Sequence, residues 1–494
     1  MKDAEVRPHK ERKRLATRRF GMADQLTFAA LSGDYNPMHV DALAARRTQA
    51  GAPVVHGMHA LLWALDALAA AGLIGPQLCE IRAQYRRFTY LDVACDLFLT
   101  HRDGDAAARA ELCSNGLVLT TIQLCNGQRQ VRAEADSAEF GAHEVAVAGH
   151  VPRAPALQDL AGLRGWTEAP GGAEDFESAF PQLVRVIGTQ RVSAFAALSR
   201  LVGMVCPGLH SIFAGFAVDL VESDSRRRGI GFAVRTINQQ FRMIGLNVYA
   251  GGFFGTVTAF MRWPPVEAPS MQAVSAVVAA GKFARAVALV VGGSRGLGAV
   301  TAKAIAAGGG RVVITYARGR DDAAKLAAEI DAACGPGACT VLAYESSRDA
   351  ASQLSAVRED VNQLYYFATP PIFPRTSEQF SPEQFHQFCA VYVDGFHDVC
   401  RFVRGRSRAP LLAAFYPSSV AVGEVPSGLA EYAKAKVEGE KLCAALTQEI
   451  AGVKIVIGRL PRVLTDQTVA IAQVESADPL TVMLPFIHKL QERA

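Results

Sequence analysis

The chain has 494 residues, of which half are apolar and one fifth are charged, an ordinary composition for a globular protein of two to four domains. Its net charge of +4 is too small to indicate nucleic acid or an acidic surface as a partner. Charged residues interrupt the most apolar segments, the N-terminus has no apolar signal core, and the ten cysteines lack metal-site spacing. We therefore expect a cytoplasmic protein with free thiols, no bound metal and no membrane span.

Two proline-rich stretches divide the chain. One is HVPRAPALQDL, near residue 150, and the other is RWPPVEAPS, near residue 265. They predict three domains, at residues 1–150, 151–275 and 280–494, each within the usual size range. The first two alternate a helical segment with several strand-like ones, which indicates an antiparallel α+β arrangement in both.

The first block contains the stretch LSGDYNPMHVD, from Leu31 to Asp41. Proline fixes its own φ and biases the residue before it away from helix, so Asn36-Pro37 favours a tight turn. Such a turn brings Asp34 and His39 to one point, where a carboxylate and an imidazole share one water and move a proton between carbon and oxygen. Taken alone, the two residues also fit a turn cap and a surface histidine.

The longer pattern FAALSGDYNPMHVD, followed by VVHGMH, resembles the MaoC-like hot-dog family of (R)-specific enoyl-thioester hydratases and dehydratases. The resemblance covers most of residues 15–140. It implies that Asp34 and His39 activate the water. It also implies that a backbone N–H around Gly57, at the start of the central helix, polarises the thioester carbonyl and stabilises an enolate-like transition state.

The five residues FAALS occur twice, at 28–32 and at 195–199. An apolar segment opened by a glycine follows each copy, at Gly57 in VVHGMHALLWALDAL and at Gly208 in CPGLHSIFAGFAVDL, and we expect both segments to be helices. The interval before the second glycine is shorter and has no aspartate or histidine. This layout resembles the double hot-dog hydratases, which implies a degenerate second half that shapes the acyl pocket.

The third block begins with VALVVGGSRGLGAVTAKAIA, an apolar strand, a glycine-rich turn and a helix. Glycines at this spacing let the backbone approach a pyrophosphate at a helix N-terminus, which predicts a dinucleotide cofactor. The candidate cofactor-binding residues of the turn are Gly292, Ser294, Arg295, Gly296, Leu297 and Gly298.

Further along the chain, Tyr432 and Lys436 share one helix face, and Ser419 lies thirteen residues before the tyrosine. Together with the glycine-rich turn, this set resembles the short-chain dehydrogenase/reductase family over roughly residues 285–470. The resemblance implies a Rossmann-type doubly wound parallel sheet. It also implies that Tyr432 is the general acid or base, that Lys436 lowers its pKa and holds the cofactor ribose, and that Ser419 orients the substrate carbonyl.

Charge indicates which nicotinamide cofactor this block prefers. The second strand, RVVITYARGR, ends without the acidic residue that would bind a ribose 2′-OH and offers Arg318 instead, while the turn contains Arg295. Two cations without a carboxylate favour a 2′-phosphate and therefore NADPH.

Three positions depart from the pattern of the reductase family. YFAT, at 366–369, stands where the family has Asn-Asn-Ala-Gly, its helix asparagine is missing near Val391 or Tyr392, and Pro461-Arg462 replaces Pro-Gly. These departures affect the family's proton relay and substrate lid, whereas the Ser-Tyr-Lys set is complete.

The leading hypothesis is a bifunctional enzyme. Its NADPH-dependent reductase would make an (R)-3-hydroxyacyl thioester from a 3-oxoacyl thioester, and its dehydratase would make the 2-enoyl product, on coenzyme A or an acyl carrier protein. Two alternatives remain open: hydration followed by oxidation with NAD, or an active hydratase with a non-catalytic, reductase-like scaffold. We expect a homo-oligomer in each case.

Overall fold

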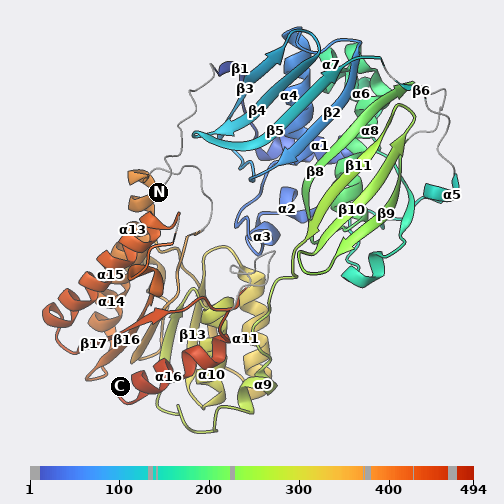
Figure 1. The fold of residues 1–494 in the computed structure, drawn as a ribbon. Helices are drawn as coiled ribbons and strands as arrows, with labels where there is room; N and C mark the ends of the chain where they lie inside the picture. The colour runs from blue at the N-terminus through green and yellow to red at the C-terminus, as the bar shows by residue number, and fades with distance from the viewer. Residues whose placement is uncertain are drawn as a thin grey trace, which may run out of the picture. The chain divides into compact units, whose positions relative to one another are not determined.

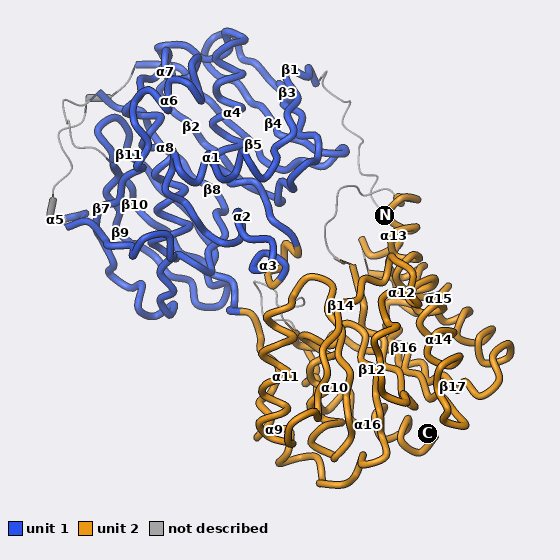
Figure 2. The backbone as a smooth tube through the Cα atoms, turned by 180° about the vertical axis from the view of Figure 1, so that it is seen from behind, with its two compact units in different colours: residues 1–46, 52–264, 470–473 blue, residues 47–51, 265–469, 474–494 orange. Residues whose placement is uncertain are grey.

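The computed structural model describes residues 12–128, 130–131, 137–140, 143–222, 229–370, 372, 380–426, 428–465 and 476–493. The chain folds into two compact units (Figure 2). Unit 1 comprises residues 1–46, 52–264 and 470–473, and unit 2 comprises residues 47–51, 265–469 and 474–494. No helix in the described ranges is long and apolar enough to cross a membrane.

Unit 1 is built on one sheet of eleven strands, which the two predicted hot-dog blocks share (Figure 1). The first block supplies β1 (Lys13–Arg19), β2 (Leu78–Tyr85), β3 (Ala94–Asp103), β4 (Ala107–Ser114), β5 (Leu117–Asn126) and the short β6 (Gln130–Val131). The second supplies β7 (Arg164–Thr167), β8 (Ser211–Glu222), β9 (Ile230–Asn238), β10 (Met243–Ala250) and β11 (Phe253–Met261).

The strand order reveals an internal repeat. It runs β1-β3-β4-β5-β2 and then β8-β11-β10-β9-β7. Counted outward from the junction of β2 and β8, the strands of each half follow one another in the same sequence-relative order. The halves join where β2 pairs antiparallel with β8, with Ala83 opposite Phe216. Gly215 permits this join, because a Cβ there would lie 2.5 Å from the carbonyl oxygen of Ala83.

Helices of unit 1 pack against this sheet and carry the site. They are α1 (Met22–Ser32), α2 (Pro37–Val40), α3 (Ala42–Ala45), α4 (Gly57–Ala70), α5 (Ser137–Phe140), the 3₁₀ turn η1 (Leu157–Leu160), α6 (Ala173–Ala179), α7 (Pro181–Ile187), α8 (Thr189–Arg200) and the π-helical turn η2 (Leu201–Val205). Helix α4 directly precedes β2, and α8 with η2 precedes β8. Because α4 and α8 also contact each other, they are the central helices of the two halves.

The prediction of a helix after Gly208 is wrong, since residues 211–222 form the strand β8. A short apolar run does not distinguish helix from strand by its periodicity, and this one is rich in Phe, Val and Ile. The second FAALS copy lies on α8, the central helix, whereas the first lies on α1. The two copies therefore occupy different places in the repeat, and the second half is not a version of the first with the site segment deleted.

Unit 2 is a parallel sheet with the order β14-β13-β12-β15-β16-β17. Its strands are β12 (Val287–Val291), β13 (Arg311–Tyr316), β14 (Cys339–Ala343), β15 (Gln363–Tyr366), β16 (Leu412–Ser419) and β17 (Val453–Leu460). The order reverses between β12 and β15, which is where doubly wound sheets bind nucleotides.

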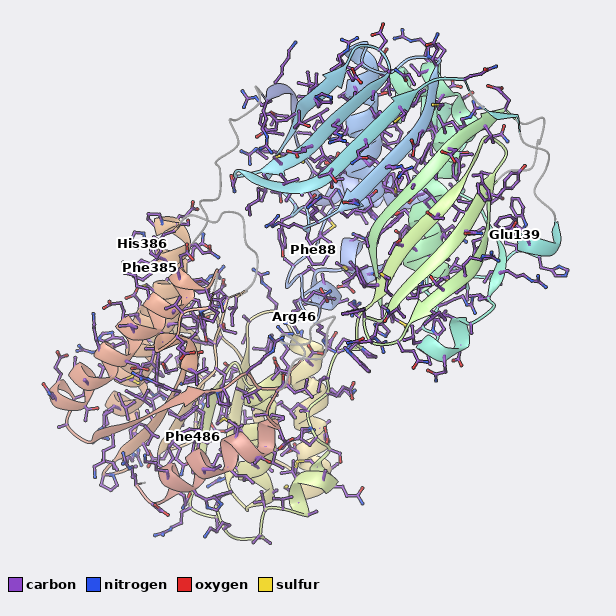
Figure 3. All side chains as sticks on the ribbon, viewed as in Figure 1. Arg46, Phe88, Glu139, Phe385, His386 and Phe486 are labelled. Atoms are coloured by element: carbon purple, nitrogen blue, oxygen red, sulfur yellow. The ribbon has the colours of Figure 1, made fainter. Side chains whose placement is uncertain are left out.

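Helices cover both faces of this sheet, over two separate apolar cores. They are α9 (Met271–Ser275), α10 (Gly296–Ala307), α11 (Arg320–Cys334), α12 (Ala350–Leu354), α13 (Pro382–Cys389), the π-helical turn η3 (Ala390–Asp394), α14 (Gly395–Arg406), the 3₁₀ turn η4 (Val420–Val422), α15 (Ala430–Glu449) and α16 (Pro479–Gln491). On one face, Phe486 of α16 packs on Phe415 of β16, with ring centroids 4.9 Å apart. Figure 3 labels Phe486 on α16.

Candidate active sites

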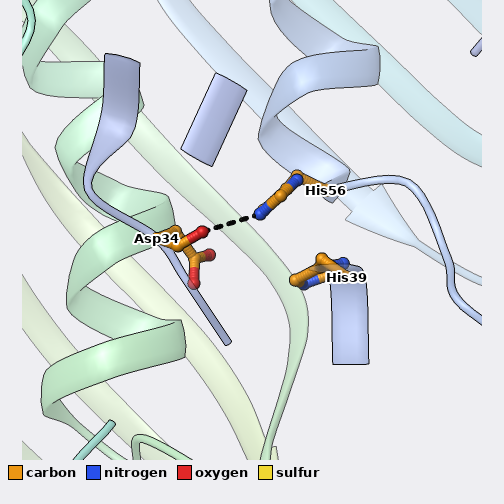
Figure 4. Close-up of side chains that lie close together, drawn as sticks. All are labelled: Asp34, His39 and His56. Atoms are coloured by element: carbon orange, nitrogen blue, oxygen red, sulfur yellow. Dashed lines mark hydrogen bonds between the residues drawn. The ribbon is translucent and has the colours of Figure 1, made fainter. Parts of the chain in front are cut away.

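The loop between α1 and α2 brings Asp34 and His39 together, as the sequence predicts (Figure 4). Helix α1 ends at Gly33, whose φ of 76° turns the chain sharply. Asn36 then caps α2 by accepting a hydrogen bond from the backbone N–H of Met38 at 3.1 Å. The predicted turn is thus the single helical turn α2, and His39 belongs to it.

Asp34 is a buried carboxylate held by several donors, with only 2% of its surface exposed. Its Oδ1 accepts from the backbone N–H of Asn36 at 3.1 Å, and its Oδ2 accepts from the hydroxyl of Ser199 at 2.7 Å. Burial raises the pKa of Asp34, while the nearby His39 and the Ser199 hydrogen bond oppose that rise. A carboxyl with a raised pKa is suited to exchange protons near neutral pH.

The ring of His39 is oriented by the backbone. Its Nδ1 lies 2.8 Å from the carbonyl oxygen of Val54, and a carbonyl only accepts, so Nδ1 carries the proton in the neutral ring. Nε2 is then the basic nitrogen, and His39 lines the same cavity as Asp34. This tautomer equips His39 to take a proton from a bound water.

His56 is a site residue that the sequence reasoning did not select, although it lies in the quoted HGM pattern. Its Nδ1 lies 2.9 Å from Gln25 Oε1, its Nε2 lies 3.0 Å from the backbone carbonyl of Asp34, and its ring stacks on His39 with centroids 4.0 Å apart (Figure 4). Burial and then His39 hold the pKa of His56 well below its usual range. His56 therefore lies between Gln25 and the Asp34 loop as a neutral ring, which donates one of these two hydrogen bonds.

The side-chain ligand atoms of Asp34, His39 and His56 lie within 4.8 Å of one another, a spacing compatible with a metal. Both nitrogens of His56, however, already face oxygens. The ring nitrogen that donates to one of these oxygens cannot bind a metal at the same time, so the cluster fits a hydrogen-bonded acid–base unit better than a metal site.

The second half of unit 1 closes the site over Asp34. Besides Ser199, it contributes Gly203 in the π-helical turn η2, where an added Cβ would lie 2.2 Å from Asp34 Oδ1. The Asn36 amide also donates to the carbonyl of Gly203 at 2.8 Å. Only glycine permits this approach, and π-helical turns often occur at functional sites. Ser199 ends the second FAALS copy, in which the sequence predicted no site residue.

A cavity of about 70 Å³ opens beside Asp34 and His39. Its lining residues from the two halves are Asp34, Asn36, Met38, His39, Val54, Val55, Gly57, Tyr85, Arg87, Phe88, Thr89, Thr120, Ser199, Val202, Gly203, Ser211, Ile212 and Phe213. Gly57 is the first residue of α4, where backbone N–H groups lack intrahelical acceptors. The Tyr85 ring lies 3.0 Å from where a Cβ of Gly57 would be, so a side chain there would obstruct access to these donors.

In unit 2 the glycine-rich turn joins β12 to α10, as predicted. Gly292 and Gly296 have φ values of 74° and 56°, which favour glycine. A Cβ on Gly298 would lie 2.4 Å from the carbonyl of Gly292, so the helix start approaches the strand end closely. The turn, which also contains Ser294, Arg295 and Leu297, leads into the N-terminus of α10, the location that the predicted pyrophosphate site requires.

The structure also brings together Ser419, at the end of β16, with Tyr432 and Lys436 on α15. Burial raises the pKa of Tyr432, and its hydrogen bond with Ser419 lowers it. Lys436 donates to the carbonyl of Pro417 at 2.7 Å, and burial lowers its pKa to about 7. Arg318 is exposed and lies just after the end of β13, the strand that pairs with β12.

Comparison with known proteins assigns two parts of the chain to families. The model of the MaoC-like domain matches residues 3–93, and that of short chain dehydrogenases matches residues 286–473. An (R)-specific enoyl-CoA hydratase of Aeromonas caviae is 45% identical over 62 residues, which are 13% of this chain and 42% of that enzyme. The chain thus spans less than half the length of this curated relative. Both predicted family resemblances, and the fold class that they imply, are confirmed.

Solved structures of short chain dehydrogenases are similar to part of the chain. A putative short chain dehydrogenase from Pseudomonas syringae is 21% identical and covers 43% of this chain and 92% of that chain, with a TM-score of 0.39. A short chain dehydrogenase from Burkholderia cenocepacia in complex with NADP is 22% identical and covers 44% of this chain and 93% of that chain, with a TM-score of 0.37.

Proposed function

We propose that the chain is a bifunctional enzyme that reduces a 3-oxoacyl thioester to the (R)-3-hydroxyacyl thioester and dehydrates this to the trans-2-enoyl thioester. The observation that carries the proposal is the presence of two separate acid–base sets, Asp34 with His39 in unit 1 and Tyr432 with Lys436 in unit 2. A hydroxyacyl thioester is the product of one chemistry and the substrate of the other. Such a sequence serves fatty-acid-like or polyketide-like biosynthesis, on coenzyme A or an acyl carrier protein.

In the first site, Asp34 and His39 hold one water between them. During hydration the water oxygen bonds to C3, one of its protons passes to the pair, and the pair returns a proton to C2; dehydration is the reverse. Charge develops on the thioester oxygen as the C2–C3 double bond opens. The backbone N–H at Gly57 stabilises that charge, because it is a fixed donor at a helix N-terminus.

In the second site, Tyr432 donates a proton to the substrate carbonyl oxygen, which Ser419 holds by a hydrogen bond. Lys436 binds the cofactor ribose, and in its charged form it favours the phenolate of Tyr432 against the effect of burial, which raises the pKa of that phenol. The turn from Gly292 to Gly298 holds the pyrophosphate. A reduced nicotinamide supplies the hydride when it is bound.

NADPH is the proposed cofactor, because Arg295 and Arg318 offer cations to a ribose 2′-phosphate. NADPH should therefore bind more tightly than NADH, and the double variant Arg295→Ala, Arg318→Ala should narrow the gap. Each charge-assisted pair contributes on the order of 1.5–3 kcal/mol, or at least about ten-fold in affinity. Fluorescence titration with both cofactors measures the ratio, and equal affinities in the wild type would contradict the assignment.

We further propose that the hot-dog part of the chain divides near residue 150 into a catalytic first domain and a degenerate second domain. The second domain ends at residue 264, before the predicted bound of 275, because residues 265–275 with helix α9 belong to unit 2, the proposed reductase domain. The contacts from Ser199 and Gly203 support a role for the second hot-dog domain in building the site, although it supplies no acid or base there.

The test supplies a 3-oxoacyl thioester and NADPH to the intact chain. We expect oxidation of NADPH and accumulation of the 2-enoyl thioester, followed by absorbance and mass spectrometry. Tyr432→Phe should abolish NADPH oxidation and still interconvert hydroxyacyl and enoyl thioesters, whereas Asp34→Asn should accumulate the hydroxyacyl species. A wild type that never consumes NADPH would favour the scaffold alternative, and one that only reduces NAD would favour the oxidative direction.

A further inference from the structure

Lys436 is a buried cation without an acidic partner. Only 5% of its surface is exposed, and its ammonium donates to the carbonyl of Pro417. Among the described residues, no carboxylate lies within ion-pair distance of this ammonium. A buried charge is costly unless something compensates it, and one carbonyl is a weak counterpart.

Aromatic rings supply the rest of its surroundings. The ammonium lies 3.7 Å from the ring centroid of Tyr392, 5.1 Å from that of Tyr416 and 5.8 Å from that of Tyr432. The Tyr392 contact is the shortest of the three. An ammonium over a tyrosine face is attracted by the ring quadrupole, most strongly where water is excluded.

Tyr392 is itself held firmly in place. It lies on the π-helical turn η3, it is 1% exposed, and its hydroxyl is 2.6 Å from the hydroxyl of Thr369. Its ring stacks on Phe388 with centroids 5.7 Å apart and meets the edge of Tyr432 at 5.8 Å. One rigid ring therefore contacts both the lysine and the tyrosine of the proposed reductase site.

We propose that Tyr392 is a positioning residue of that site. The face of its ring holds the ammonium of Lys436 in place beside Tyr432 and stabilises its charged form. This rests on the proposed reductase function. A ring stabilises a cation without adding a negative charge, whereas a carboxylate would neutralise the field that Lys436 exerts on the phenol. The surroundings of Lys436 thus leave its positive charge uncancelled beside Tyr432.

The effect of removing the ring has a definite sign. Losing the ring disfavours the charged form, so the pKa of Lys436 should fall further below its present value of about 7. The other titratable groups around the ammonium are Tyr416, Tyr432 and the thiol of Cys443. Burial raises the pKa of each, so all three are neutral near pH 7 and do not replace the ring.

The test compares Tyr392→Leu, which removes the ring, with Tyr392→Phe, which keeps the ring and loses only the Thr369 contact. Phe385→Leu is the control, since it removes a ring of helix α13 whose ring contacts are with Phe380 and His386 and not with Tyr392 or Tyr432. In the full chain labelled with ¹³Cε-lysine, the Lys436 signal, identified by its absence in Lys436→Met, is titrated by NMR. We expect the pKa to fall in Tyr392→Leu and to stay near the wild-type value in the other two.

Turnover gives a second readout. Reduction of the 3-oxoacyl thioester should slow about ten-fold or more in kcat for Tyr392→Leu, with Tyr392→Phe within about two-fold of wild type. Hydration by unit 1 should be unchanged in all variants, and thermal unfolding of the full chain reports whether unit 2, which has its own cores, is folded. An unchanged Lys436 titration in Tyr392→Leu would overturn the inference, as would an equal loss in Tyr392→Phe. The titration of Lys436 does not depend on turnover. A wild type that fails to oxidise NADPH would therefore count against the proposed function, while the NMR titration would still test the role of Tyr392.

Discussion

At the scale of single residues, the first site contains a buried carboxylate, Asp34, whose ionised form is stabilised by hydrogen-bond donors. Asp34 is almost inaccessible, and its two oxygens accept from a backbone N–H and from Ser199. These donors stabilise the ionised form against desolvation. Ser199 comes from the other half of the repeat, so the acid–base behaviour of Asp34 depends on both halves.

Asp34→Asn and His39→Ala should each slow hydration of a short trans-2-enoyl thioester by about 10²–10⁴-fold, the usual cost of losing a positioned acid–base group. Loss of the enoyl absorbance measures the rate. Asp105→Asn and His101→Ala are matched controls, because both residues are exposed and lie outside the cavity. Retention of more than about half of the activity in both site variants would refute the assignment.

Ser199→Ala should change the pH dependence of hydration as well as its rate. The hydroxyl stabilises the ionised carboxylate, so its removal raises the pKa of Asp34 further. If the ionised carboxylate is the active form, the acidic limb of the kcat/KM profile moves to higher pH. Ser193→Ala, on the same helix but bonded to Gln190, should leave the profile in place. A parallel loss of rate at every pH would indicate a purely structural role.

At the scale of elements, the sequence predicted what local chemistry dictates and failed where packing decides. The Asn-Pro pair predicted the turn that joins Asp34 to His39, and the glycine-rich turn and the Tyr-Lys helix appear as expected. Strand β8 was mistaken for a helix, because an apolar run fits either period until its partner strands are known. Contacts such as that of Ser199 join residues far apart in the chain, and no local pattern contains them.

Strand β8 places Phe213 in the cavity wall, edge-to-face with Tyr85 at 5.2 Å. Phe213→Ala should therefore enlarge the acyl pocket and shift preference toward longer acyl chains. Phe216, further along β8, is buried behind Phe213 and does not line the cavity, so Phe216→Leu should change stability more than preference. The measurement is kcat/KM across enoyl thioesters of increasing length. A change in turnover without a change in acyl-chain-length preference would contradict the role of Phe213 in the pocket wall.

At the scale of the whole molecule, two units with their own cores carry two complementary chemistries. The hydrophobic cluster of unit 1 spans both hot-dog halves, while unit 2 has its own clusters on the two faces of its sheet. Each site described above draws its residues from one unit alone. Under the proposed function, the two units need to share only the hydroxyacyl thioester.

A mixing experiment tests that independence. Asp34→Asn retains the proposed reductase site and Tyr432→Phe retains the proposed dehydratase site, so neither variant alone should convert a 3-oxoacyl thioester and NADPH to the enoyl product. An equimolar mixture should do so, because the hydroxyacyl thioester released by one chain is a substrate for the other. Its formation should follow a lag that shortens as the protein concentration rises, since transfer between chains is bimolecular. Mass spectrometry of all three thioesters over time measures this. A mixture that oxidises NADPH and yet makes no enoyl product would show that the intermediate does not pass between chains, and would contradict sites that act independently.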